Sequence, residues 1–278
     1  VPEMSKHGYA RSLAAGATAA GGTLGILIPP SVPMILYGVI TETSIGGLFL
    51  AGILPGLMMA ALLSGTVILQ VLMNPSIAPA ITHRVSFTER VKTSAEAFPT
   101  VLIAVMIIGA LYAGIASPSE TGAFGAAAAV LVALALGKLK GGVLPKALQK
   151  TVRTTGMFML LLVGGLFSSF VLTRLGVPQD ISNYLTGLDV PPWVIIVTIN
   201  ILLLIMGMFL DPLSILVIVV PIFLDTIVGL GYDPIWFGVI VTIQIEIAAI
   251  TPPVGLNLFV LRTVVPDLSI TETAKGAI

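Results

Sequence analysis

Two adjacent prolines interrupt an apolar stretch near each end of the chain, and this feature restricts the fold most strongly. The first pair, Pro29-Pro30, lies within an uncharged run at 12–41, and the second, Pro252-Pro253, also lies in apolar sequence. A proline has no amide hydrogen to donate and pushes the preceding residue away from helical angles, so each stretch is predicted to form two half-helices joined by unwound backbone. In hydrocarbon, such backbone is tolerated only where it is buried in protein or lines a watery cavity. The two breaks therefore predict a functional site.

The composition indicates the medium in which these breaks lie. Hydrophobic residues make up 56% of the chain and charged residues only 9%, against roughly 25% charged in an average soluble domain. Long uncharged runs without strand alternation predict an all-α, multi-spanning integral membrane protein rather than a barrel. The zero net charge argues against a nucleic-acid partner. The predicted membrane segments are 12–41, 48–73, 99–116, 121–137, 154–173, 190–210, 212–224 and 234–261, the last interrupted by Glu246.

The distribution of lysine and arginine predicts which connections face the cytoplasm. Basic residues gather before the first run, in 75–98 and in 138–153, whereas the connections at 176–192 and 225–233 carry only acids. The basic connections are therefore predicted to lie inside and the acidic ones outside. The two basic segments are expected either to lie as helices along the inner membrane surface, held by lipid, or to be solvated loops.

Each membrane crossing should lead from one side of the membrane to the other. The segments 190–210 and 212–224 are an exception to single crossings, because together they lead from one acidic outer connection to another. This predicts a re-entrant hairpin with its tip at 207–212, although two spanning helices with an inner turn at Asp211-Pro212 remain possible. With the hairpin, the two broken helices run in opposite directions across the membrane. Opposed broken helices are the signature of inverted repeats, in which substrate and ions bind near the midplane.

The unwound segments offer suitable groups for ions and for an anion. Free carbonyl oxygens can bind a hard cation, and the amino ends of the half-helices favour an anionic substrate. Gly25 and Gly207 allow the backbone to approach an ion closely, Thr251 adds a hydroxyl, and Asn257 adds an amide. The alternative for any single break is a simple kink repaired by its neighbours.

Three acidic residues lie at or near the ends of apolar segments, where ionisable groups are costly and often functional. Glu246, close to the second break, is the best candidate for a proton or charge role, and Asp211 at the hairpin tip is similar. Glu120 is interpreted as a structural residue at a helix amino terminus. The two histidines, His7 and His83, lie in predicted cytoplasmic segments without a catalytic or metal-binding pattern, so the chain is not expected to be an enzyme.

Three motifs, GGTLGILIPPS at 21–31, SPSET at 117–121 and TPPVGLNLF at 251–259, together resemble the large membrane subunit of tripartite ATP-independent periplasmic (TRAP) transporters. The resemblance covers essentially the whole chain and implies a member of the ion transporter superfamily with inverted repeats. It implies sodium-coupled uptake of a small organic acid, of the sialic acid or C4-dicarboxylate type, across the bacterial inner membrane. The implied partners are a small membrane subunit, a soluble periplasmic binding protein and membrane lipid.

The resemblance also implies particular site residues. A first sodium site would use backbone oxygens of Gly25, Ile28 and Pro30 and would be completed by a hairpin that precedes Val1. A second would use Gly207, Ala248, Thr251 and Val254, with alanine at 248 where the family commonly has glycine. Ser31 and Asn257 are the expected substrate contacts. The chain begins without methionine and ends abruptly, so it is expected to be a fragment that starts after the first hairpin and stops before the last membrane helix.

These inferences divide the chain into four predicted parts of an elevator-type transporter. They are a first broken helix (1–47), scaffold and arm helices (48–176), a re-entrant hairpin (177–233), and a second broken helix with a tail (234–278). Two rivals remain, namely a proton-coupled carboxylate carrier that depends on Glu246 or Asp211, and a non-transporting scaffold subunit whose breaks are mere kinks.

Overall fold

The computed structural model describes residues 1–79, 86–253, 255–265, 273 and 276, which contain helices and no strands. The chain forms two compact units, which we call the core unit (1–79 and 162–278) and the arm unit (80–161). Four described helices are long and apolar enough to cross a membrane, and a bent helix pair makes a fifth candidate span. The predicted all-α membrane fold is therefore confirmed.

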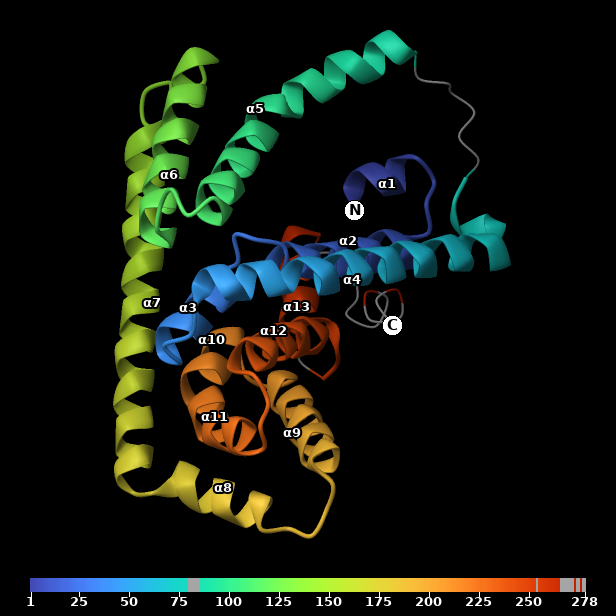
Figure 1. Cartoon of the computed structure of the whole chain (residues 1–278). Helices are drawn as coiled ribbons and strands as arrows, with labels where there is room; N and C mark the ends of the chain where they lie inside the picture. The colour runs from blue at the N-terminus through green and yellow to red at the C-terminus, as the bar shows by residue number, and fades with distance from the viewer. Residues whose placement is uncertain (80–85, 254, 266–272, 274–275, 277–278) are drawn as a thin grey trace. The chain divides into compact units, whose positions relative to one another are not determined.

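The core unit contains most of the helices labelled in Figure 1. Each predicted apolar run in this unit becomes a helix or a broken helix. The elements are α1 (Pro2–Lys6), α2 (Arg11–Leu27), α3 (Val32–Ile40), α4 (Ile45–Met73), a 3₁₀ turn (Pro75–Ile77), the later part of α7 (Val143–Arg174), α8 (Val177–Thr186), α9 (Pro192–Gly207), α10 (Pro212–Ser214), a π turn (Ile215–Val219), α11 (Val220–Gly229), α12 (Pro234–Ile250) and α13 (Leu256–Val264).

The arm unit contains α5 (Phe87–Tyr112), α6 (Pro118–Ala135) and the earlier part of α7. In the basic segment 75–98, residues 75–77 form the 3₁₀ turn and residues 87–98 belong to α5, and most of the segment 138–153 belongs to α7. Most of both segments is therefore helical rather than loop, and the expectation that these helices lie along the inner membrane surface stays a prediction. Residues 80–85 lie outside the described part of the chain.

Local sequence explains where several helices begin. Ser117 and Glu120 form a capping box at the start of α6, where the Ser117 amide donates to the Glu120 carboxylate at 2.8 Å, so the structural interpretation of Glu120 is confirmed. The Asp233 carboxylate accepts from the amides of the second and third residues of α12, at 2.6 and 3.2 Å. A proline follows the cap in both helices, at the position where its missing amide hydrogen costs nothing.

Both double-proline stretches break their helices as predicted. Helix α2 ends at Leu27 and α3 begins at Val32, with a bend of 41° between them. Helix α12 ends at Ile250 and α13 begins at Leu256. Gly255 precedes α13 with φ of 56°, a left-handed conformation that glycine adopts without strain. Each proline pair contains a cis peptide bond.

The two broken helices run in opposite directions. Near the end of α3, the Tyr37 hydroxyl donates to the carbonyl of Pro234, at the start of α12, at 2.7 Å. Near the end of α12, the Glu246 carboxylate faces the Thr23 side chain, in the last part of α2. Because the beginning of α12 lies beside α3 and its end lies beside α2, the antiparallel arrangement predicted from the charges is confirmed.

Each second half-helix packs on the other broken helix. Helix α3 contacts α12, where Gly238 leaves room for the ring of Tyr37. Helix α13 contacts α2, where Leu258 and Ala19 are buried together with Ile250 packed against them. Each broken helix therefore contributes to the packing of the other within the core unit.

The hairpin of α9 and α10–α11 is braced by a helix that the sequence did not predict. Helix α8 occupies part of the expected outer loop and packs against α11. Ile181 of α8, Ile199 of α9 and Phe223 of α11 line one cavity, and Gln179 donates to the Asp225 carboxylate at 3.2 Å. The signal for α8 was available in its amphipathic pattern and in Pro178 near its start, but the flanking acids favoured a loop.

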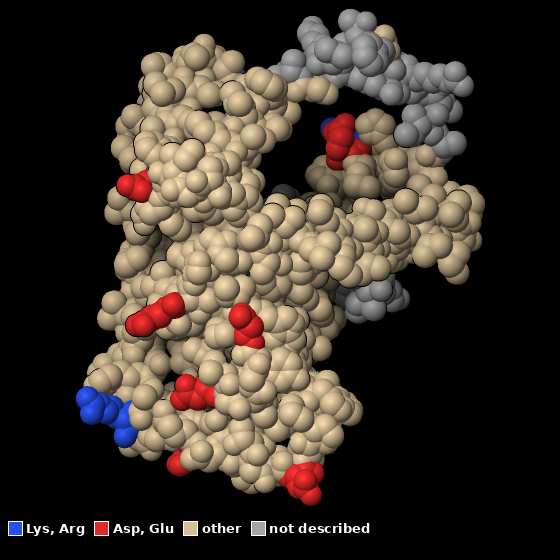
Figure 2. Space-filling view, in the orientation of Figure 1, with Lys and Arg blue, Asp and Glu red and all other residues tan. Residues whose placement is uncertain are grey.

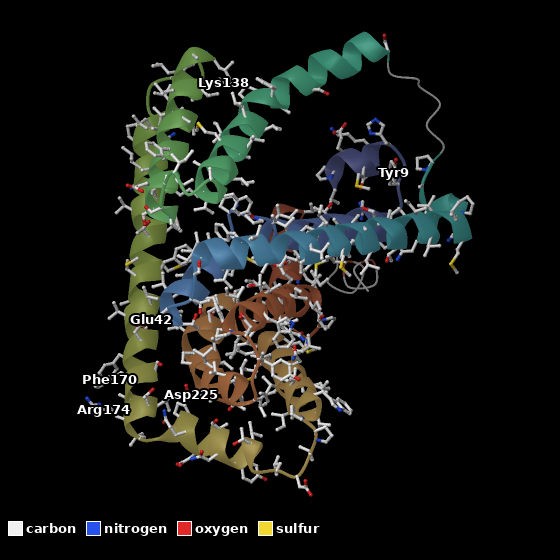
Figure 3. All side chains as sticks on the ribbon, viewed as in Figure 1. Tyr9, Glu42, Lys138, Phe170, Arg174 and Asp225 are labelled. Carbon is white, nitrogen blue, oxygen red and sulfur yellow. The ribbon has the colours of Figure 1, made fainter. Side chains whose placement is uncertain are left out.

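Charged residues are sparse on the surface of the core unit, as expected for a protein surrounded by lipid. Over α8 and α11, the charged side chains visible in Figure 2 are acidic apart from one basic cluster. These basic atoms belong to Arg174, which Figure 3 labels beside Phe170. The Arg174 guanidinium lies 5.1 Å from the centroid of the Phe170 ring. The acidic character expected for the outer connections is therefore concentrated at one end of this unit.

Candidate ion and substrate site

The tip of the hairpin meets the last turn of α12. A methyl group on Gly207 would lie 2.6 Å from the Ala248 Cβ, which is shorter than real Cβ contacts, and 3.1 Å from the Ile215 side chain, which is tight. Only glycine allows this approach. The structure therefore brings together two of the residues predicted for the second sodium site.

The other predicted members of this site lie at the break itself. Thr251 has extended backbone angles, and its amide donates to the Ala248 carbonyl at 3.1 Å. Its hydroxyl donates to the Ile247 carbonyl at 2.6 Å, which leaves the hydroxyl lone pairs available as acceptors. Val254 lies outside the described residues. The hydroxyl and these carbonyls therefore lie at the end of α12, where Ala248 contacts the hairpin tip.

A small cavity lies beside this contact. It has a volume of about 10 Å³, which is the space needed for about one water molecule. The cavity is lined by Gly207, Leu210, Pro212, Ile215, Ile245, Ala249 and Leu256. A space of this size excludes an organic substrate, and among the described residues predicted to bind sodium, Gly207 alone lines it.

In the predicted first sodium site, the Ile28 side chain lies near Gly56 of α4, whereas Gly25 and Pro30 are exposed. Gly25 is exposed, and a methyl group on it would meet nothing within 4 Å. Ile28 is 46% exposed, and Pro30 is also exposed. Leu27, which lies between Gly25 and Ile28, is fully buried. The face of the break that carries Gly25, Ile28 and Pro30 is therefore open, while the opposite face packs into the core unit.

The two predicted substrate residues occupy comparable places after the breaks. Ser31 precedes α3 as its N-cap, is 1% exposed, and accepts a hydrogen bond from the Met34 amide at 3.4 Å. Asn257 lies in the first turn of α13 and is half-buried. Helix amino ends with free amides are suitable for an anionic group, so both residues lie where a carboxylate could be received.

The structure separates the two acids that the sequence treated alike. The Asp211 carboxylate caps α10 by accepting from the amides of Leu213 and Ser214 at 3.0 and 3.2 Å and from the Ser214 hydroxyl. Its oxygens are thus used by the hairpin turn. Glu246 is 1% exposed, and no hydrogen bond of good geometry reaches either of its oxygens within the described chain.

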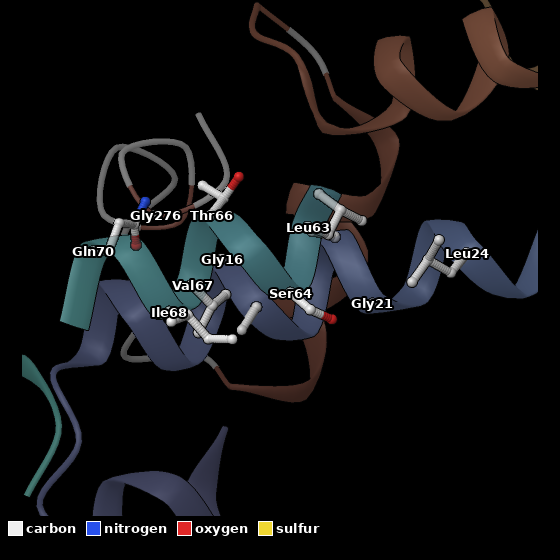
Figure 4. Close-up of a pocket in the computed structure, with 12 residues that line it drawn as sticks. Gly16, Gly21, Leu24, Leu63, Ser64, Thr66, Val67, Ile68, Gln70 and Gly276 are labelled. Atoms are coloured by element: carbon white, nitrogen blue, oxygen red, sulfur yellow. The ribbon is translucent and has the colours of Figure 1, made fainter. Parts of the chain in front are cut away.

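A larger cavity, which the sequence did not predict, lies between α2 and α4 (Figure 4). It has a volume of about 360 Å³. Its α2 wall consists mainly of the small residues Gly16, Ala17, Ala20 and Gly21, whose short side chains leave the space open. Small residues spaced four apart were a visible signal, but none of the predicted ion or substrate residues lines this cavity.

Comparison with known proteins identifies the family. The model of the family described as "Tripartite ATP-independent periplasmic transporter, DctM component" matches residues 1–278. The C4-dicarboxylate TRAP transporter large permease protein DctM of Pseudomonas aeruginosa is 38% identical over 276 residues, which cover 99% of this chain and 64% of that protein. The sialic acid TRAP transporter large permease protein SiaM of Vibrio cholerae is 34% identical over 283 residues, which cover 100% of this chain and 64% of that protein.

A third relative, the ectoine/5-hydroxyectoine TRAP transporter large permease protein UehC of Ruegeria pomeroyi, is 35% identical over 93% of this chain and 60% of that protein. The chain thus spans less than two thirds of the length of these relatives. They share the permease role and differ in the substrate that each name gives, and none is named as an enzyme. The chain belongs to the DctM family, the large permease component of the tripartite ATP-independent periplasmic transporters.

Proposed function

We propose that the chain is part of a secondary transporter that couples inward sodium movement to uptake of a small organic acid. The observation that carries this proposal is the close approach of Gly207 to Ala248, beside unwound backbone and a small cavity. Oxygen ligands without competing charge suit a hard monovalent cation. The amino ends of α3 and α13, with Ser31 and Asn257, receive the carboxylate of the substrate.

The proposed cargo and partners follow from the family. The substrate is a small carboxylate, of the C4-dicarboxylate or sialic acid type, which are the substrates named for two of the relatives. It is delivered by a soluble periplasmic binding protein, and the chain works beside a small membrane subunit in the bacterial inner membrane. Sodium entry along the membrane potential supplies about 2.3 kcal/mol per charge per 100 mV, so more than one ion per singly charged anion drives accumulation.

The proposal predicts that uptake by the complete transporter in proteoliposomes stops when external sodium is replaced by potassium. A site selective for sodium excludes the larger potassium ion, so the substrate loses its driving ion. Radiolabelled acid accumulation at fixed membrane potential measures the effect. Undiminished uptake in potassium refutes sodium coupling, and uptake driven by a pH gradient alone decides for the proton-coupled alternative.

A second prediction concerns Thr251 at the break. The variant Thr251→Val keeps the size of the side chain and removes its hydroxyl, so we expect a higher sodium concentration for half-maximal uptake. Losing one oxygen ligand of this kind costs about 1 kcal/mol, or roughly fivefold in affinity. Thr251→Ser restores the hydroxyl and serves as the control. An unchanged sodium response in the valine variant removes Thr251 from the site.

A further inference from the structure

An unpaired acid is buried where the two broken helices cross. Glu246 of α12 is 1% exposed, and no hydrogen bond of good geometry reaches its two oxygens from the described residues. The Thr23 hydroxyl lies beside the carboxylate but donates its proton to the Ala20 carbonyl. The ion pairs formed within the described chain both use another acid, Glu3. An ionised carboxylate is strongly disfavoured in a low-dielectric interior unless an opposite charge accompanies it. Glu246 therefore needs a neutralising partner from outside the described protein.

Glu246 and Thr23 occupy equivalent positions relative to the two breaks. Glu246 lies six residues before Pro252, and Thr23, which faces it from α2, lies six residues before Pro29. The broken helices run in opposite directions, and these two residues at equivalent positions face each other where α2 packs on α12. Glu246 lies two residues before Ala248, which contacts the hairpin tip.

The described side chain that interacts with Glu246 is that of Thr23, which supplies an oxygen and no positive charge. The Thr23 hydroxyl donates to the Ala20 carbonyl at 2.6 Å, so its lone pairs remain free to coordinate an ion. Arg11, the basic residue of α2, lies twelve residues before Thr23, about 18 Å away along the helix. Among the described residues no group of three acids or histidines gathers, and a single carboxylate suits a monovalent cation better than a divalent one.

We propose that Glu246 and Thr23 form a further sodium site where α2 packs on α12. The carboxylate neutralises this ion with a full charge, whereas the ions at the breaks are held by neutral backbone oxygens. The inference rests on the proposed sodium coupling and adds one ion to the transport cycle. It accounts for an acid that is buried where α12 packs on α2 without a hydrogen-bond partner among the described residues.

The test is a count of sodium ions. Radioactive sodium bound at saturation is measured per complete transporter in lipid nanodiscs, for the unmodified protein and for Glu246→Gln, which keeps the shape and removes the charge. We expect Glu246→Gln to bind one sodium fewer and to carry one sodium fewer per substrate in proteoliposomes. The control is Glu120→Gln, which changes an exposed capping acid and leaves the count unchanged.

The outcomes separate this inference from the proposed function. If the unmodified transporter binds no sodium, the proposed function fails. If it binds sodium and Glu246→Gln binds the same number, only the further site is overturned, and a proton is the neutralising partner. Should Glu246→Gln not assemble, Thr23→Val decides, because it keeps the acid and removes the neighbouring oxygen. A severalfold weaker sodium affinity supports the site, and an unchanged affinity overturns it.

Discussion

Gly207→Ala is expected to weaken sodium-dependent uptake severely, although it adds a single methyl group. That methyl group would lie 2.6 Å from the Ala248 Cβ, so the hairpin tip and α12 have to separate. Overpacking of this kind costs about 1–3 kcal/mol, which corresponds to roughly 5- to 150-fold in sodium affinity. The sodium concentration for half-maximal uptake in proteoliposomes measures the change.

The structure supplies both a rescue and a control for this variant. Because the opposing atom is itself a methyl group, adding Ala248→Gly to Gly207→Ala moves the methyl group across the contact and is expected to restore most of the affinity. Gly229→Ala, at the far end of the same hairpin, adds a methyl group with ordinary spacing of 3.9 Å and leaves uptake unchanged. A single variant with normal sodium affinity, or a failed rescue, contradicts the proposed site.

Gly238→Ala is expected to destabilise the whole core unit. Its methyl group would lie 2.6 Å from both the Tyr37 ring and the Leu48 side chain. Tyr37 cannot yield easily, because it is fully buried, its hydroxyl is bonded to Pro234, and its ring lies 6.4 Å from that of Phe237. We expect the free energy of unfolding to fall by about 1–3 kcal/mol, measured as a lower thermal midpoint of the purified complex in detergent.

Gly65→Ala is the matched control for this substitution. Gly65 lies in the middle of α4, and a methyl group there meets nothing within 4 Å. Alanine favours the helix over glycine by about 0.5–1 kcal/mol, so this variant keeps or raises the thermal midpoint. Equal behaviour of the two variants would show that the close packing between α3 and α12 does not stabilise the fold.

The sequence predicted the helical architecture and the breaks because both depend on local chemistry. Missing amide hydrogens at Pro29-Pro30 and Pro252-Pro253 interrupt any helix, whatever surrounds them. The opposed direction of the broken helices followed from the placement of basic residues, which the cell reads during insertion. Gly207 and Ala248 could be paired only through the family resemblance, since they are forty-one residues apart and nothing local links them.

Other features depend on tertiary packing and could not be predicted in this way. The pattern did not show that Asp211 would be used as a helix cap while Glu246 would be left without a partner. It also missed α8, whose helix is stabilised by burial against α11 rather than by its own propensity. The sodium and substrate roles of the predicted residues stay predictions that the experiments above test.

The reciprocal packing of α3 on α12 and of α13 on α2 has a mechanical consequence. The second half of each interrupted helix packs against the first half of the other, α3 on α12 and α13 on α2. A shift of one interrupted helix alone would therefore break this packing. Any displacement that carries cargo from one side of the membrane to the other must therefore move both interruptions as one block. If sodium binds at both interruptions as proposed, the two ions move together.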